Sequence, residues 1–151
     1  MKKLLLTTAL LAGCGGVPQT SPIGPKCDAW YPYEDLDTSR WAIRYMSPQT
    51  TWKPTGACPG RIDGYEVNVA PGDTWWVEHE FPGFIGDTAR ITAKVRANDN
   101  GLRFVDIGGQ RVTTNGNIAQ TERKLTSKWT TYQIGGTGTF WIGDATFYFG
   151  P

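Results

Sequence analysis

The segment Thr74–Phe81, "TWWVEHEF", carries the side chains best suited to chemistry in this sequence. Alternate side chains of an extended strand share a face, so Trp76, Glu78 and Glu80 lie together, opposite Trp75. Sugars have apolar C–H faces that stack on indole rings, and polar side chains around the ring bind their hydroxyl groups. The spacing therefore predicts a ligand-binding role for these three outward residues, of the kind found in carbohydrate sites.

Two catalytic interpretations of the same segment have less support. Glu78 and Glu80 would lie ~6.5–7 Å apart, within the range that glycosidases use, but those carboxylate pairs normally come from different strands across a cleft. His79, the only histidine, shares a face with Trp75 and Phe81, so we expect a buried, hydrogen-bonded imidazole. No nucleophile signature such as G-x-S-x-G accompanies it. We therefore expect no enzymatic activity.

Aromatic content supports the binding interpretation, because the chain holds seven tryptophans in 151 residues. Trp141 alternates with Phe140 and Ile142, which predicts that it points outward. Trp52 lies in "QTTWKPTG", which we expect to be a loop, and is a further ligand-contact candidate. Tryptophans also fill the cores of small sandwiches, and three are expected there: Trp41, Trp75 and Trp129.

The first residues have the pattern of an export signal. Lys2 and Lys3 precede the nine uncharged residues Leu4–Ala12, a positive n-region followed by a short apolar h-region. A helix of nine residues spans only ~14 Å, about half of a bilayer core of ~30 Å. This length disfavours a transmembrane helix, and we expect residues 1–13 to be a cleaved signal peptide.

The sequence "LAGC", Leu11–Cys14, resembles the lipobox of bacterial lipoproteins. The resemblance implies cleavage before Cys14 and attachment of acyl chains to its thiol, although a free cysteine beside an ordinary cleavage site is the alternative. Each buried methylene contributes ~0.8 kcal/mol, so two or three chains hold a protein on a membrane. The implied location is the bacterial cell envelope, extracytoplasmic and lipid-anchored. Gly15, where an aspartate would favour inner-membrane retention, implies the outer membrane if two membranes are present.

Cys27 and Cys58 are then in an oxidising compartment, where a disulfide persists. Two free thiols, or half of a metal site, are the alternatives. Zinc is disfavoured because no third cysteine is near and the chain has one histidine. We expect the disulfide.

We expect the mature chain to consist of a tether followed by one domain. Residues 14–25 comprise the lipidated cysteine and the uncharged, Gly- and Pro-rich "GGVPQTSPIGP", and residues 26–151 form the domain. Without Lys2 and Lys3 the 15 basic residues become 13, against 14 acidic ones. A net charge of −1 gives no electrostatic reason to expect nucleic acid as a partner.

The domain has the composition of β-structure, with short Thr-, Val- and aromatic-rich runs separated by Gly or Pro. In "ARITAKVRA", Ile91, Ala93 and Val95 alternate with polar residues, and "NDNG", residues 98–101, predicts a hairpin into "LRFVDI". Further strands are expected at residues 64–70, 74–81, 128–134, 139–143 and 145–150. The pattern predicts an all-β, antiparallel β-sandwich or barrel.

Two longer segments, "DTARITAKVRANDNGLRFVDIGG" and "KLTSKWTTYQI…TFWIGDATFYF", resemble the central hairpin and closing strands of galactose-binding-like jelly rolls, the fold of many carbohydrate-binding modules. The resemblance implies a jelly-roll β-sandwich. Many members hold a structural calcium with acids at both ends of the domain, which here implies Glu34 or Asp35 with Asp144. Gly143 replaces the first of the family's two closing acids, and the alternative role for Asp144 is to start a strand or bridge a turn.

These observations lead to one functional hypothesis and one alternative. The first is a membrane-anchored, extracytoplasmic lipoprotein whose sandwich binds a carbohydrate or glycan without catalysis. The alternative is a structural or protein-interaction domain that contacts another envelope protein.

Overall fold

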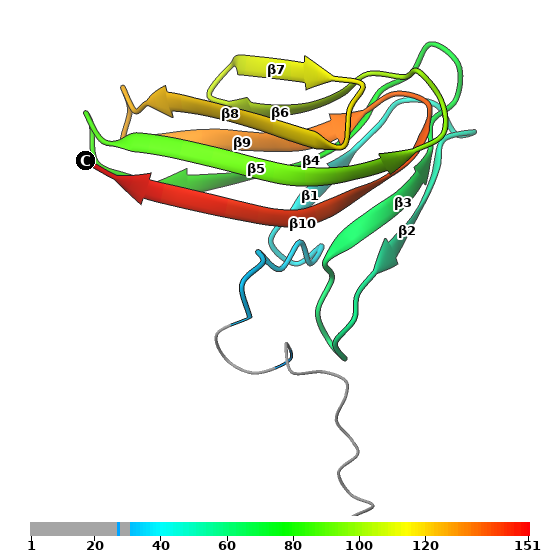
Figure 1. The fold of residues 1–151 in the computed structure, drawn as a ribbon, viewed down its shortest axis with the longest axis horizontal. Helices are drawn as coiled ribbons and strands as arrows, with labels where there is room; N and C mark the ends of the chain where they lie inside the picture. The colour runs from blue at the N-terminus through cyan, green and yellow to red at the C-terminus, as the bar shows by residue number, and fades with distance from the viewer. Residues whose placement is uncertain (1–26, 28–30) are drawn as a thin grey trace, which may run out of the picture.

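The computed structural model describes residue 27 and residues 31–151, which form two five-stranded antiparallel sheets packed face to face (Figure 1). The β4 sheet has the order β1-β4-β9-β6-β7, and the β10 sheet the order β2-β3-β10-β5-β8. The strands are β1 Ala42–Arg44, β2 Thr51–Thr55, β3 Gly64–Asn68, β4 Trp75–Pro82, β5 Thr88–Ala97, β6 Arg103–Ile107, β7 Gln110–Thr114, β8 Ile118–Lys124, β9 Trp129–Gly136 and β10 Thr139–Gly150. The all-β, antiparallel sandwich is confirmed.

Strand pairing follows a jelly roll. The last eight strands form four nested antiparallel pairs, β3 with β10, β4 with β9, β5 with β8 and β6 with β7. This nesting is the double Greek key of jelly-roll sandwiches. Strands β1 and β2 each extend one sheet by an edge strand.

The core lies between the sheets and follows the predicted alternation. Ile91, Ala93 and Val95 of β5 are buried, and Trp41 and Trp75 are fully buried, as expected. The core cluster as a whole contains Leu36, Trp41, Tyr65, Val67, Val69, Trp75, Val77, Ala89, Ile91, Ala93, Val95, Val105, Ile107, Ala119, Leu125, Tyr132, Ile134, Phe140, Ile142 and Ala145.

The prediction for Trp129 is wrong, because its side chain is 53% exposed. Trp129 is an odd number of residues from the buried Tyr132, so the two side chains leave β9 on opposite faces. The outward position was therefore implied by the same alternation that placed Tyr132 inside.

The predicted hairpin at residues 98–101 is also wrong. β5 pairs with β10 and β8, whereas β6 pairs with β7 and β9 in the opposite sheet. The segment instead carries the chain from one layer to the other (Figure 1). An Asn-Gly turn permits a tight reversal but does not choose the strand's partner.

Two further expectations differ from the structure. The segments 139–143 and 145–150 form one strand, β10, whose register shifts between Gly143 and Thr146. Asp144 within this bulge has a positive φ of 48°. Trp52 lies in β2 rather than in a loop, and Pro54 is tolerated there because β2 is an edge strand.

The predicted disulfide is present between Cys27 and Cys58, with a Cα–Cα distance of 5.4 Å. It connects the start of the described chain to the β2–β3 connection. No helix in the described part of the chain is long and apolar enough to cross a bilayer.

Candidate functional site

A groove of about 730 Å³ lies on the outer face of the β4 sheet. Strands β4, β9, β6 and β7 contribute its floor, and the segment before β9 contributes one end. We call it the β4 groove; its lining residues are Glu78, Asp106, Gly108, Gly109, Arg111, Arg123, Leu125, Thr126, Ser127, Trp129, Thr130, Thr131 and Gln133.

Glu78 is the centre of a hydrogen-bond network in this groove. Its carboxylate accepts bonds from Arg44 Nε at 2.8 Å, Trp76 Nε1 at 2.9 Å and Gln133 Nε2 at 3.0 Å. Burial of Glu78 opposes ionisation, but these hydrogen bonds outweigh it and lower the pKa of the carboxyl below its ordinary value. Glu78 is therefore a fixed anion at neutral pH.

The network continues across the sheet because Glu78, Gln133, Asp106 and Arg111 occupy one cross-strand row. Arg111 Nη2 donates to Gln133 Oε1 at 2.8 Å, and Arg111 Nε lies 3.3 Å from Asp106 Oδ2. The Arg111 guanidinium also lies over the ring of Phe104, 3.7 Å from its centroid. Two carboxylates, one amide and one guanidinium thus hold one another in place on an open surface, so little side-chain entropy remains to be lost on binding a ligand.

Indole rings mark the two ends of this face. Trp76 lies opposite Gly135, where an added Cβ would come 2.5 Å from the Trp76 Cβ, so glycine permits the close approach of the two strands there. Trp129 begins β9, six residues before Gly135, which corresponds to about 20 Å along the strand. The face therefore has the length of an extended ligand, with aromatic rings at its ends and polar groups between.

This arrangement suits binding better than acid–base catalysis. A glycosidase needs a general acid with a raised pKa, whereas the pKa of Glu78 is lowered. Glu80 is exposed and lies opposite Thr131, on the same face as Glu78, as predicted. His79 is on the inner side among aromatic rings, 4.4 Å from Phe81 and 5.5 Å from Trp41 between ring centroids. It is half-buried rather than buried as expected.

A second groove, of about 740 Å³, lies on the β10 sheet and includes Trp141. Gly64 and Gly143 leave space for the edge of its indole ring, since a Cβ on either glycine would come 2.7 Å from Trp141 Cζ2. The Arg96 guanidinium covers the ring at 3.8 Å from its centroid, and Trp141 Nε1 donates to Thr55 Oγ1 at 2.8 Å. Trp141 is half-buried, so its outward direction is as predicted, but its ring is already stacked.

Trp52 does not form a flat platform with Trp141. It occupies the same cross-strand row as the buried Val67 and Phe140, so it points to the other face of the β10 sheet. Its ring packs edge-on against Tyr65, with 5.9 Å between centroids.

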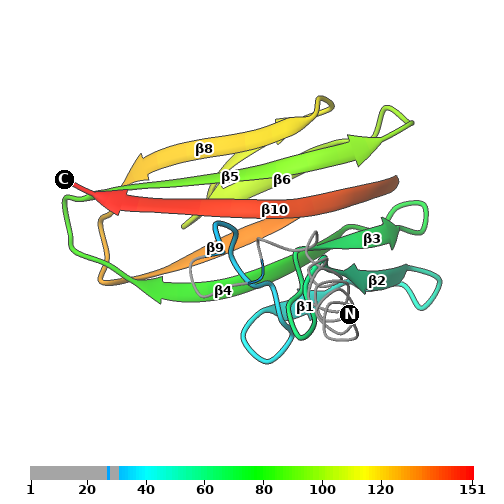
Figure 2. The same ribbon diagram turned by 60° about the horizontal axis from the view of Figure 1, so that its bottom comes forward.

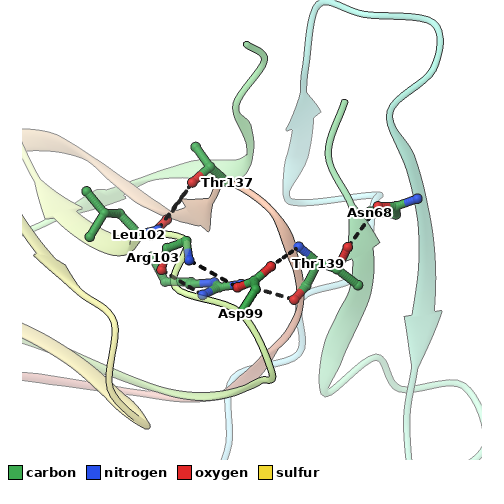
Figure 3. A network of polar contacts seen from close by, with 7 residues as sticks. Asn68, Asp99, Leu102, Arg103, Thr137 and Thr139 are labelled. Carbon is green, nitrogen blue, oxygen red and sulfur yellow. Dashed lines mark hydrogen bonds and ion pairs between the residues drawn. The ribbon is translucent and has the colours of Figure 1, made fainter. Parts of the chain in front are cut away.

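One end of the second groove is fixed by a polar network around Asp99 (Figure 3). The carboxylate pairs with Arg103, a fully buried side chain, and accepts backbone bonds from Thr139 at 2.8 Å and Gly101 at 3.1 Å. The bonds from Thr139 and Arg103 lower the pKa of Asp99 to about 2. This network locks the crossover between the sheets to the start of β10.

The acids predicted to hold calcium have separate partners. Glu34 pairs with Arg40 at 3.0 Å, Asp35 accepts a bond from the Ile62 backbone at 3.1 Å, and Lys94 lies 3.5 Å from Asp144. Within residue 27 and residues 31–151, no group of three His, Cys, Asp or Glu side chains could hold a metal. These contacts give the predicted calcium site no support.

The predicted site residues thus fall into separate places. Trp76, Glu78 and Glu80 share the β4 face, whereas Trp141 and Trp52 belong to the other sheet. Cys14, the predicted lipidation site, lies outside the described residues. The structure adds three residues of the same cross-strand row that the sequence analysis missed: Gln133, which donates to Glu78, and beyond it Asp106 and Arg111. Alternation along β9 could have placed Gln133 outward, but nothing local indicated which strand would lie beside it.

Comparison with known proteins supports the fold. No protein-family model and no curated protein matches the sequence. Among solved structures, the enzymatically active domain of tailspike protein 4 of bacteriophage CBA120 has a TM-score of 0.52 at 10% identity; the match covers 75% of this chain and 20% of that chain. This chain thus spans about a fifth of the tailspike chain, and the likeness shows the sandwich fold alone.

Two carbohydrate-binding modules are also similar, at lower scores. TmCBM61, solved with β-1,4-galactotriose, has a TM-score of 0.44 at 14% identity, covering 76% of this chain and 93% of that one. The family 11 module of the cellulase Lic26A-Cel5E of Clostridium thermocellum has a TM-score of 0.42 at 13% identity, covering 87% and 97%. Function is therefore argued from the grooves themselves.

Proposed function

We propose that this protein is a lipid-anchored, extracytoplasmic lipoprotein whose sandwich binds a glycan, without catalysis, in the β4 groove. The observation that carries the proposal is the ordered row of Glu78, Gln133, Asp106 and Arg111, which offers fixed donors and acceptors in the same groove as the half-exposed indole of Trp129. Sugars need both features, polar groups for hydroxyls and a ring for their apolar faces.

The second groove fits this role less well. Its indole ring is covered by Arg96, whereas the side chain of Trp129 in the β4 groove is about half exposed. The aromatic rings of the β10 sheet also lie on opposite faces, so they offer no common stacking surface.

Affinity electrophoresis of the oxidised mature chain against a panel of polysaccharides and peptidoglycan tests the binding proposal. Trp129→Ala should lower the apparent affinity for the bound glycan, measured from the retardation, at least tenfold, because the exposed stacking ring is lost. Trp52→Ala, a partly exposed tryptophan of the other sheet, is the matched control and should leave retardation unchanged. Absence of retardation on every glycan, or loss only in Trp52→Ala, would refute the β4 groove as the site.

The anchor needs its own experiment, since the disulfide supports only an oxidising, extracytoplasmic compartment. In a bacterial host grown with an alkyne-labelled fatty acid, the wild-type chain should incorporate label and fractionate with membranes. Cys14→Ser should lose both properties. Membrane crosslinking that captured one stoichiometric protein neighbour, together with no glycan binding, would favour the protein-interaction alternative.

A further inference from the structure

An apolar projection occupies the end of the sandwich where β4 turns into β5. The loop Gly83–Asp87, "GFIGD", holds Phe84 at 80% exposed and Ile85 at 70% exposed, next to each other in the chain. Trp129, 53% exposed, lies beside it because β9 begins opposite Pro82. Figure 2 shows this loop and the β8–β9 connection at the same end of the molecule as the C terminus. We call Phe84, Ile85 and Trp129 the apolar tip.

Backbone hydrogen bonds hold the loop of the apolar tip in place. Gly83 N donates to Lys128 O at 2.8 Å, Gly86 N donates to Leu125 O at 2.8 Å, and Leu125 N donates to Asp87 O at 2.8 Å. The two ends of the loop are thereby hydrogen-bonded to the β8–β9 connection. Phe84 and Ile85 are therefore exposed on a loop whose backbone is hydrogen-bonded to the neighbouring connection.

The shape and composition of the apolar tip match a bilayer interface. Phe84 and Ile85 line neither of the two grooves, whereas Trp129 also lines one end of the β4 groove. The exposed side chains of Phe84 and Ile85 would enter the headgroup region together, next to the start of β9. Tryptophan is enriched at that depth, and lysines beside it favour anionic headgroups. Lys128 directly precedes Trp129, and Lys124 Nζ lies 3.3 Å from Gly86 O, on the loop itself.

We propose that the apolar tip inserts into the interface of an anionic lipid bilayer, as a second membrane contact besides the proposed anchor. The lipid anchor of the proposed function contributes to this contact only by bringing the domain near a membrane.

The tether is long enough to permit both contacts. The disulfide connects Cys27 to the β2–β3 connection, next to Gly64, which pairs with Gly143 of β10. The apolar tip adjoins the other end of β10, where Gly150 pairs with Thr88. Gly150 is seven residues after Gly143, which corresponds to about 23 Å along the strand. Residues 15–26 reach at most about 40 Å, so a domain anchored at Cys14 can place its tip on the same bilayer.

The test uses the oxidised chain from residue 14 onward with Cys14→Ser, so that no acyl chain holds it. Binding to vesicles of phosphatidylcholine with phosphatidylglycerol is measured by flotation, with quenching of tryptophan fluorescence by brominated acyl chains as a measure of insertion. Phe84→Asp and Ile85→Asp should each weaken binding at least tenfold and abolish quenching, because a charge replaces an inserted apolar group.

Met46→Asp is the matched control, because Met46 is 88% exposed and lies beyond the opposite end of β4, where its backbone bonds Asp73. It should bind vesicles like the Cys14→Ser chain. All variants should unfold at the same temperature, because the side chains of Phe84, Ile85 and Met46 are largely exposed.

No vesicle binding by the Cys14→Ser chain, or equal loss in Met46→Asp, would overturn the proposal. A dimer that Phe84→Asp converts to a monomer in light scattering, without vesicle binding, would also overturn it and make the apolar tip a self-association surface. The vesicles contain no glycan, so failure here leaves glycan retardation untouched, and failure of the β4 groove leaves vesicle binding untouched.

Discussion

Removal of the Asp99 carboxylate is the most informative perturbation of the fold. Arg103 is fully buried, and its guanidinium donates to Gly101 O at 2.6 Å and Thr139 O at 3.0 Å besides its pairing with Asp99 (Figure 3). Asp99→Ala leaves this cation inside the protein without its carboxylate. It also deprives the backbone N–H groups of Gly101 and Thr139 of their acceptor.

The loss of unfolding free energy in Asp99→Ala should lie between the loss expected for breaking a buried ion pair and that for breaking an exposed one. Breaking a buried pair costs about 3–5 kcal/mol, and an exposed pair contributes about 0–1 kcal/mol. Arg103 has no exposed surface, but Asp99 is 40% exposed, and water there weakens the interaction. We expect Asp99→Ala to lower the free energy of unfolding by about 2–3 kcal/mol, which for a domain of this size lowers Tm by roughly 8–12 °C.

Urea unfolding followed by tryptophan fluorescence measures this change. Glu122→Ala is the control, because it breaks the Arg90–Glu122 pair, whose side chains are both nearly half exposed; it should cost less than about 1 kcal/mol. Adding Arg103→Met to Asp99→Ala should recover part of the loss, since the unpaired buried charge is gone. A loss in Asp99→Ala no larger than that in Glu122→Ala would refute the reasoning.

Two further predictions concern acid and reduction. Burial raises the pKa of Asp73, but hydrogen bonds from the Thr50 hydroxyl and from backbone N–H groups outweigh it and bring the pKa to about 2, as for Asp99. Unfolded aspartates titrate near ~3.9, so both carboxylates stabilise the native state above that pH. The urea midpoint should therefore fall as pH drops from about 4 to about 2, and a flat profile would contradict this account. Cys27→Ser should lower the free energy of unfolding by roughly 3–4 kcal/mol, the chain-entropy value for a separation of 31 residues, and dithiothreitol should have no further effect on that variant.

Alternation along single strands was predictable from the sequence. The outward positions of Trp76, Glu78 and Glu80 follow from the pleat of one strand, whatever its neighbours are. The same rule, applied to β9 from Tyr132, would also have placed Trp129 outward. The error there came from treating tryptophan as a core residue by composition rather than from its position.

Pairing between strands was not predictable in the same way. Residues 98–101 have hairpin composition, yet β6 lies in the opposite sheet from β5, and the Asp99–Arg103 network stabilises this crossover. The partners of β5 are β10 and β8, which follow it by some twenty to fifty residues. No local turn preference carries information over that separation.

The sequence by itself determined an all-β domain and the sheet face on which each side chain of β4 and β5 lies, and it favoured the disulfide between Cys27 and Cys58. It also predicts the signal peptide and the anchor at Cys14. Only the tertiary structure decided that Glu78 meets Gln133 and Asp106 in one row, and that the loop of the exposed Phe84 is bonded to the connection before Trp129. The physical reason is that a side chain's direction depends on the local backbone, whereas its neighbours depend on which distant strands bury the most apolar surface together.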